Sequence, residues 1–326
     1  MLSFIKLIRL PNLIIVALTQ YFMRFLIIKP MLGHFSMKTS GIYQMYELEL
    51  QMSELDFFLL VMATVLLTAA GYVINDYFDR RIDQINKPDK VVVGKTINRR
   101  TAMTLHWVFN VIGVVLGFYV SWKIGIYKLG FIFLIITGIL WYYTTSYKKQ
   151  FLIGNLVVAL LTALVPLMVI LYELPLLNTL YGPTIILHDA DFRGIFYWVL
   201  AFSVFAFITT LIREMVKDTE DFEGDSMYGG NTLPIIAGIF ITKVVIISLS
   251  LVTLAGIVVL YFTFLNDWLS AVYGSVWLIM PFLIFMFLII KAKTQKEYHL
   301  ASTIMKLIML NGIFYSVVVW YIVNNI

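Results

Sequence analysis

Long apolar segments alternate with short polar ones along the whole chain. Most are about 20 residues long, the length that a helix needs to cross ~30 Å of hydrocarbon at about 1.5 Å per residue. The pattern predicts nine membrane spans, at residues 11–29, 57–75, 101–121, 127–145, 151–172, 195–213, 235–263, 271–290 and 303–323. No small-residue cleavage signature follows the first of them, so we expect it to be retained. We therefore predict an all-α, polytopic membrane protein in which residues 1–326 form a single domain.

Composition agrees with this class, since 61% of the residues are hydrophobic and only 13% are charged. The absence of cysteine excludes disulfides, thiolate metal sites and a cysteine nucleophile. The longest segments outside the predicted spans, 30–56 and 173–194, leave no room for a soluble domain but can hold short helices. The span at 235–263 is long enough to tilt or to project from the bilayer.

Basic residues mark one side of the membrane. Of the 24 lysines and arginines, 17 precede the first span or lie near the loops that follow even-numbered spans. Because cytoplasmic loops hold the excess of basic residues, we expect the N-terminus and these loops in the cytoplasm, in a protein of the cell membrane. The net charge of +5 also suits anionic lipid headgroups and gives no indication of nucleic-acid binding.

Two groups of three aspartates repeat one spacing, i, i+3 and i+7. The first ladder is Asp76, Asp79 and Asp83, and the second ladder is Asp218, Asp221 and Asp225. On a helix this spacing places each group on one face, within an arc of roughly 60°. Both ladders follow even-numbered spans, so we expect them to converge on the cytoplasmic side. Six converging carboxylates repel one another unless cations lie among them.

The residues around the ladders favour magnesium and a phosphate. Oxygen ligands without cysteine or a paired histidine site indicate Mg²⁺ rather than zinc. The four histidines show no mutual spacing and are expected to be structural. Basic residues flank the ladders: Arg80, Arg81, Lys87 and Lys90 after the first, and Arg213 and Lys217 before the second.

Carboxylates, Mg²⁺ and cations together suit a diphosphate, and hydrocarbon walls beneath them suit an isoprenoid diphosphate. The expected chemistry is ionisation of the allylic C–O bond, with cations stabilising the departing pyrophosphate. Aromatic faces can stabilise the allylic cation. The candidates near the cytoplasmic span ends are Tyr72, Tyr77, Trp141, Tyr142 and Tyr143.

At these positions the chain resembles the UbiA superfamily of intramembrane prenyltransferases. Asn75 and the first ladder match its motif Asn-Asp-x-x-Asp-x-x-x-Asp, and the second ladder matches its motif Asp-x-x-Asp-x-x-x-Asp. Lesser family features occur in order: Arg9, Asn12, Tyr143, Lys148, Gly154 and Asn155. The resemblance implies nine helices around a central cavity, Mg²⁺ as cofactor, and transfer of a prenyl group from its diphosphate to an acceptor.

Roles for individual residues follow from the motifs, their flanks and this resemblance. All six ladder aspartates are expected to bind the metal. Catalytic roles are expected for Asp76, Asp79, Asp218, Asp221, Tyr143 and Lys148. Substrate contacts are expected for Arg9, Asn12, Asn75, Lys87, Arg213 and Lys217.

The acceptor is less well defined. The stretch REMVKDTEDFEGD resembles the branch of the family that adds geranylgeranyl to geranylgeranylglyceryl phosphate, and a phosphate on that acceptor could use the cations near Lys148 or Lys87. An aromatic acceptor, as in quinone or tocopherol-type synthesis, is the alternative within the family. A cation-coupled transporter is the alternative of another class, although it would favour carboxylates at mid-membrane. The CDP-alcohol phosphotransferase motif Asp-Gly-x-x-Ala-Arg is missing.

Overall fold

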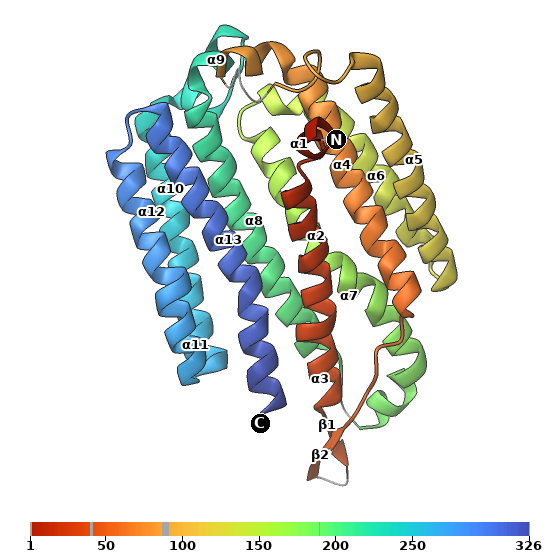
Figure 1. The fold of residues 1–326 in the computed structure, drawn as a ribbon. Helices are drawn as coiled ribbons and strands as arrows, with labels where there is room; N and C mark the ends of the chain where they lie inside the picture. The colour runs from red at the N-terminus through yellow and green to blue at the C-terminus, as the bar shows by residue number, and fades with distance from the viewer. Residues whose placement is uncertain (1, 40–41, 87–90, 189, 326) are drawn as a thin grey trace.

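The computed structural model describes residues 2–39, 42–86, 91–188 and 190–325. Within these residues, nine helical segments are long and apolar enough to cross a membrane. They lie side by side as one bundle (Figure 1). The predicted all-α, nine-span architecture is therefore confirmed.

A short helix, α1 (Leu2–Leu7), precedes the first span. That span is continuous through α2 (Leu10–Phe22), the π-helix η1 (Met23–Ile28) and α3 (Lys29–Gly33). The next three spans and their short connecting helices are α4 (Glu54–Asn86), α5 (Arg99–Lys123), η3 (Tyr127–Leu129), α6 (Gly130–Thr145) and η4 (Tyr147–Lys149).

The remaining spans and their connecting helices are α7 (Ile153–Leu187), α8 (Arg193–Glu220), α9 (Phe222–Met227), α10 (Leu233–Leu260), η5 (Tyr261–Leu265), α11 (Trp268–Tyr273), η6 (Gly274–Ile279), α12 (Met280–Lys291) and α13 (Gln295–Asn324). The seventh span, predicted to be the longest, continues through η5 and is interrupted at Gly238, whose φ of 85° is a conformation that glycine adopts without steric cost.

The N-terminus, α9 and the C-terminal ends of α4 and α8 lie at one end of the bundle, at the top in Figure 1. An antiparallel hairpin, β1 (Phe35–Thr39) and β2 (Ile42–Tyr46), lies at the opposite end. The sequence pattern did not predict this hairpin. Both ladders therefore lie near one end of the molecule, on different helices.

The fifth span is the largest departure from the predicted boundaries, because α7 continues to Leu187 where the pattern ended it at residue 172. The hydropathy signal falls at Glu173, a charged residue that would normally end a span. In the structure Glu173 is fully buried and its carboxylate pairs with the Arg24 guanidinium at 2.7 Å. Prolines at 166, 175 and 183 lie inside this helix, which changes direction along its length in Figure 1.

Candidate active site

A cavity of about 1230 Å³ lies between the helices and is lined by residues of α2, α4, α6, α7, α8 and α13. Its polar end carries all six ladder aspartates, together with lysines and arginines. Its other end is lined by apolar side chains such as Leu67, Phe133 and Val165. The cavity is thus suited to a molecule with an anionic head and a hydrocarbon tail.

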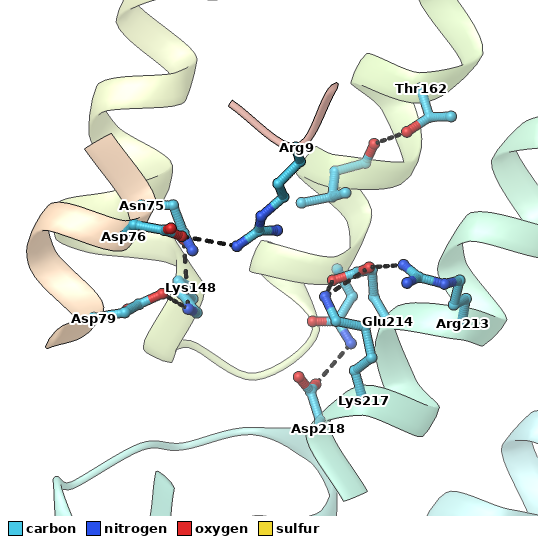
Figure 2. Close-up of polar contacts among 12 residues, drawn as sticks. Arg9, Asn75, Asp76, Asp79, Lys148, Thr162, Arg213, Glu214, Lys217 and Asp218 are labelled. Atoms are coloured by element: carbon cyan, nitrogen blue, oxygen red, sulfur yellow. Dashed lines mark hydrogen bonds and ion pairs between the residues drawn. The ribbon is translucent and has the colours of Figure 1, made fainter. Parts of the chain in front are cut away.

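The first ladder lies on one unbroken helix, as its spacing predicts, since α4 continues through Asp83 to Asn86. Asp79 is the most deeply buried of these carboxylates, with 5% of its surface exposed. Two cations from distant parts of the chain reach this ladder: Arg9 bonds Asp76, and Lys148 bonds Asp79 (Figure 2). The carboxylates of α4 are therefore compensated by segments that precede α2 and follow α6.

Arg9 is held in an uncommon backbone conformation. It lies between α1 and α2 with φ 52° and ψ 51°, the left-handed region that few non-glycine residues occupy. Its Nη2 donates to Asp76 Oδ1 at 2.8 Å, and its guanidinium lies 4.8 Å from the centre of the Tyr72 ring. Desolvation opposes its charge, but Asp76, Tyr72 and Asp79 together raise the pKa of Arg9 above its usual value. Strain of this kind is commonly retained at functional sites.

Lys148 reaches the cavity from η4, the short helix between α6 and α7. Its Nζ donates to Asp79 and, at 3.4 Å, to Asn75 Oδ1. Desolvation opposes this charge too, but the neighbouring Asp79 raises the pKa of Lys148 above its ordinary value. Gly154 permits this approach, because a Cβ there would lie 2.9 Å from both Lys148 Cα and the Tyr147 carbonyl oxygen.

The second ladder differs from the prediction, because it does not lie on one continuous helix. Asp218 belongs to the last turn of α8, Asp221 occupies the junction, and Asp225 lies in α9. The Asp225 backbone N–H still donates to the Asp221 carbonyl at 3.1 Å, so near-helical spacing persists through the break. All three side chains consequently still line the cavity, and α9 contacts α4.

The cations that precede the second ladder pair with a different carboxylate. Arg213 Nη1 lies 3.1 Å from Glu214 Oε1, and Lys217 Nζ lies 2.9 Å from Glu214 Oε2 (Figure 2). Asp218 instead accepts a 2.8 Å hydrogen bond from the Asn155 amide. In the described part of the chain no cationic nitrogen lies within 4.0 Å of the Asp218 carboxylate.

Helix α13 adds cavity residues for which no role was predicted. Lys306 Nζ donates to Asn12 Oδ1 at 2.8 Å, and His299 Nδ1 lies 3.0 Å from Glu220 Oε1. All four side chains line the cavity. In the sequence, Lys306 is one of the basic residues counted as topology determinants, and His299 is expected to be structural.

Most of the predicted site residues lie at this cavity. Those that line it besides the aspartates are Arg9, Asn12, Asn75, Tyr143, Lys148, Arg213 and Lys217. Lys87 lies outside the described residues.

Among the candidate aromatics, Tyr72 and Tyr143 line the cavity, whereas Tyr77, Trp141 and Tyr142 do not. Tyr77 instead packs under Arg99, and Trp141 packs against His106. Asn110 and Lys243 also lie away from the cavity, hydrogen-bonded to neighbouring groups.

The donor set fits a hard divalent cation. Carboxylate oxygens from α4, α8 and α9 line one cavity end, and oxygen ligands are those that Mg²⁺ prefers. Within the described residues no three acidic or histidine side chains are close enough together to enclose an ion without help. A site with few protein ligands is usual for Mg²⁺, which keeps waters and substrate phosphate oxygens in its shell.

Comparison with known proteins identifies relatives at 30% sequence identity or more. Digeranylgeranylglyceryl phosphate synthase of Methanothermobacter thermautotrophicus is 32% identical over 199 residues, which are 60% of this chain and 62% of that protein, less than two thirds of its length. The protein of the same name from Methanosphaera stadtmanae is 30% identical over 246 residues, 74% of this chain and 80% of that one.

The fold has a solved counterpart in a UbiA homologue from Archaeoglobus fulgidus, whose structure contains DMAPP and Mg²⁺. That protein is 15% identical and superposes with a TM-score of 0.55 over 97% of this chain and 99% of its own. Residues 45–310 match the UbiA prenyltransferase family, and this match includes both ladders. With the nine spans of its described residues, its two aspartate ladders and the cavity between them, the chain belongs to the UbiA prenyltransferase family.

Proposed function

We propose that this protein transfers a prenyl group, with Mg²⁺ as cofactor, from its diphosphate to an isoprenoid glycerol phosphate, forming an ether lipid and pyrophosphate. One observation carries the proposal: a single cavity joins an end lined by carboxylates and cations to an apolar end within the bundle. A prenyl diphosphate has the same two parts. The cavity is lined by residues from Ser3 to Ile313, which supports one domain over the whole chain.

The residues of the polar end suit a departing diphosphate. The ladder aspartates would hold Mg²⁺, which when bound neutralises the charge that develops on the leaving pyrophosphate. Lys148 and Arg9 add fixed positive charge at the same end, in a cavity where electrostatic interactions are stronger than in water. The rings of Tyr72 and Tyr143 line the cavity nearby and can stabilise the allylic cation through their π faces.

The acceptor is inferred from charge and from the relatives. Arg213, Lys217 and Lys306 line the α8 and α13 side of the cavity, apart from Lys148. These three cations can bind the phosphate of the acceptor. From the sequence alone, that phosphate was expected near Lys148 or Lys87. The curated relatives described above are named digeranylgeranylglyceryl phosphate synthase. A phosphorylated isoprenoid glycerol fits both observations better than an aromatic acid.

In the proposed reaction the allylic C–O bond of the donor breaks and pyrophosphate leaves with the electron pair. The acceptor hydroxyl oxygen then bonds to C1 of the allylic cation, and its proton passes to a nearby base or to pyrophosphate. A hydroxyl is a weak nucleophile, so ionisation precedes attack or runs well ahead of it.

A competition assay tests the acceptor. Purified protein with Mg²⁺ and geranylgeranyl diphosphate would be offered geranylgeranylglyceryl phosphate, homogentisate, 4-hydroxybenzoate and dihydroxynaphthoate together. We expect an alkali-stable ether lipid as the main product by mass. A prenylated aromatic as the main product would contradict the acceptor assignment, and an absence of pyrophosphate release with every acceptor would favour a transporter.

We further infer that the ladder end faces the cytoplasm of the cell membrane, because that end carries the excess of basic residues. The chain has no cysteine, so single cysteines can be introduced at the exposed positions Gln84 and Ser226. Neither should react with an impermeant thiol reagent in intact cells, and both should react after lysis. Labelling of either one from outside would overturn this orientation.

A further inference from the structure

On the α6 and α7 side, the residues that line the apolar end of the cavity stop at a defined depth. On α6 the cavity runs from Tyr143 to Phe133, and on α7 it runs from Asn155 to Met168. At about 1.5 Å per helical residue, these stretches correspond to roughly 15 Å and roughly 20 Å. Beyond them the helices pack into a hydrophobic core that includes Leu60 and Tyr172, neither of which lines the cavity.

Phe133 forms one side of this closed end, and its ring is fixed by neighbours on two helices. Only 1% of its surface is exposed. The Phe133 ring packs edge-on against Tyr172 with centroids 6.4 Å apart, and the Tyr172 hydroxyl lies 2.6 Å from Ser121 Oγ. A Cβ at Gly117 of α5 would collide with the Phe133 ring, so the glycine creates the space that the ring occupies.

Met23 of η1 and Met168 of α7 also line this end, and both are almost wholly buried. Met23 begins the π-helical turn η1, and the next residue, Arg24, is bound to Glu173 of α7 at 2.7 Å. This buried ion pair joins the first span to α7 at positions that follow Met23 and Met168 in the chain. Phe133, Met23 and Met168 therefore form a supported floor of the cavity.

We propose that this floor sets the length of the prenyl donor at about four isoprene units. A four-unit chain has about sixteen carbons in line, and with C–C bonds of about 1.5 Å it extends roughly 20 Å. This length is comparable to the roughly 15 to 20 Å of the α6 and α7 stretches that line the cavity. A fifth unit would have to displace Phe133 or the methionines, whereas a three-unit donor leaves apolar surface unfilled. This inference rests on the proposed function, since it concerns the donor of that reaction.

The test measures kcat/KM for three-, four- and five-unit prenyl diphosphates with one acceptor. Phe133→Ala should raise the ratio of five-unit to four-unit activity at least about tenfold, the scale on which apolar pockets discriminate by size. Met168→Phe should change specificity in the opposite direction, toward the three-unit donor. Phe282→Ala is the matched control, because Phe282 is equally buried but belongs to another core cluster and does not line the cavity.

The outcomes separate the two proposals. If the wild-type protein turns over the four-unit donor but Phe133→Ala and Met168→Phe both leave the ratios unchanged, the floor assignment is wrong and the proposed function stands. If the wild-type protein turns over no prenyl diphosphate, the proposed function itself fails. If Phe133→Ala does not fold, the Met168→Phe ratio decides, and a shift toward the three-unit donor supports the floor.

Discussion

The two aspartate ladders share one spacing, yet the structure gives them different surroundings. The first lies on the unbroken helix α4, and its carboxylates are bonded by Arg9 and Lys148 from other segments. The second crosses the junction between α8 and α9, and the cations beside it are bonded to Glu214. Its Asp218 is held by the neutral amide of Asn155.

This difference shows that repeated spacing does not imply repeated electrostatics. At the first ladder, fixed positive charge already lies against the carboxylates, so this side combines metal ligands with cations for a diphosphate. At the second ladder, Asp218 accepts a hydrogen bond from a neutral amide, which orients the carboxylate without adding positive charge. We therefore expect the first ladder to depend on its lysine and the second on its amide.

The largest effect is expected from removing a ladder carboxylate on either side. Asp79→Asn and Asp218→Asn should each lower turnover at least about 10³-fold, because each loses a carboxylate charge that would hold the Mg²⁺ on which the departing pyrophosphate depends. Steady-state assays measure this effect, and gel filtration in detergent should show both variants monodisperse. Full activity in Asp79→Asn would remove the basis of the metal-site assignment.

Lys148 should matter more than Lys217. Lys148→Met is expected to lower kcat about 10²- to 10³-fold, the cost of losing one preorganised charge aimed at the reaction. Lys217→Met should cost less, because Lys217 is bonded to Glu214 rather than to a ladder aspartate. Parallel kcat measurements decide this, and an equal loss in the two variants would contradict the asymmetry between the ladders.

Asn155 should control metal affinity through Asp218. Asn155→Ala removes the amide that orients this carboxylate, and partners of that kind typically change metal affinity about 10- to 100-fold. The Mg²⁺ concentration for half-maximal activity should rise accordingly. Asn110→Ala is the control, since Asn110 is also a buried asparagine but bonds within α5, away from the cavity. An unchanged Mg²⁺ requirement in Asn155→Ala would separate Asn155 from the metal site.

The smallest effect is expected from Gly154→Ala. The added Cβ would lie 2.9 Å from Lys148 Cα, so the Lys148 backbone must shift, and since about 1 Å of misplacement can cost about 10²-fold, we expect roughly tenfold lower kcat. Gly182→Ala in the same helix has open space around it and should leave kcat unchanged. Wild-type kcat in Gly154→Ala would show that the loop tolerates the shift.

The sequence by itself determined the nine spans and the position of both ladders. These features are local: a span is recognised from about 20 consecutive apolar residues, and a ladder from its own spacing. The motifs identified Asn75 and the aspartates, and the family resemblance that they carry added Lys148 and implied a central cavity. The aromatic candidates show the limit, since Tyr143 and Trp141 are both near span ends but only Tyr143 lines the cavity.

Tertiary structure alone decided which charges meet. The pairing of Arg9 with Asp76 and of Lys306 with Asn12 joins residues 67 and 294 positions apart, and no local pattern encodes such contacts. The extension of α7 past Glu173 depends in the same way on Arg24 from the first span, because a buried carboxylate is tolerated only where a partner neutralises it. The depth of the cavity likewise follows from how Phe133 packs against Gly117 and Tyr172, since side chains from separate helices close a space only after those helices have assembled.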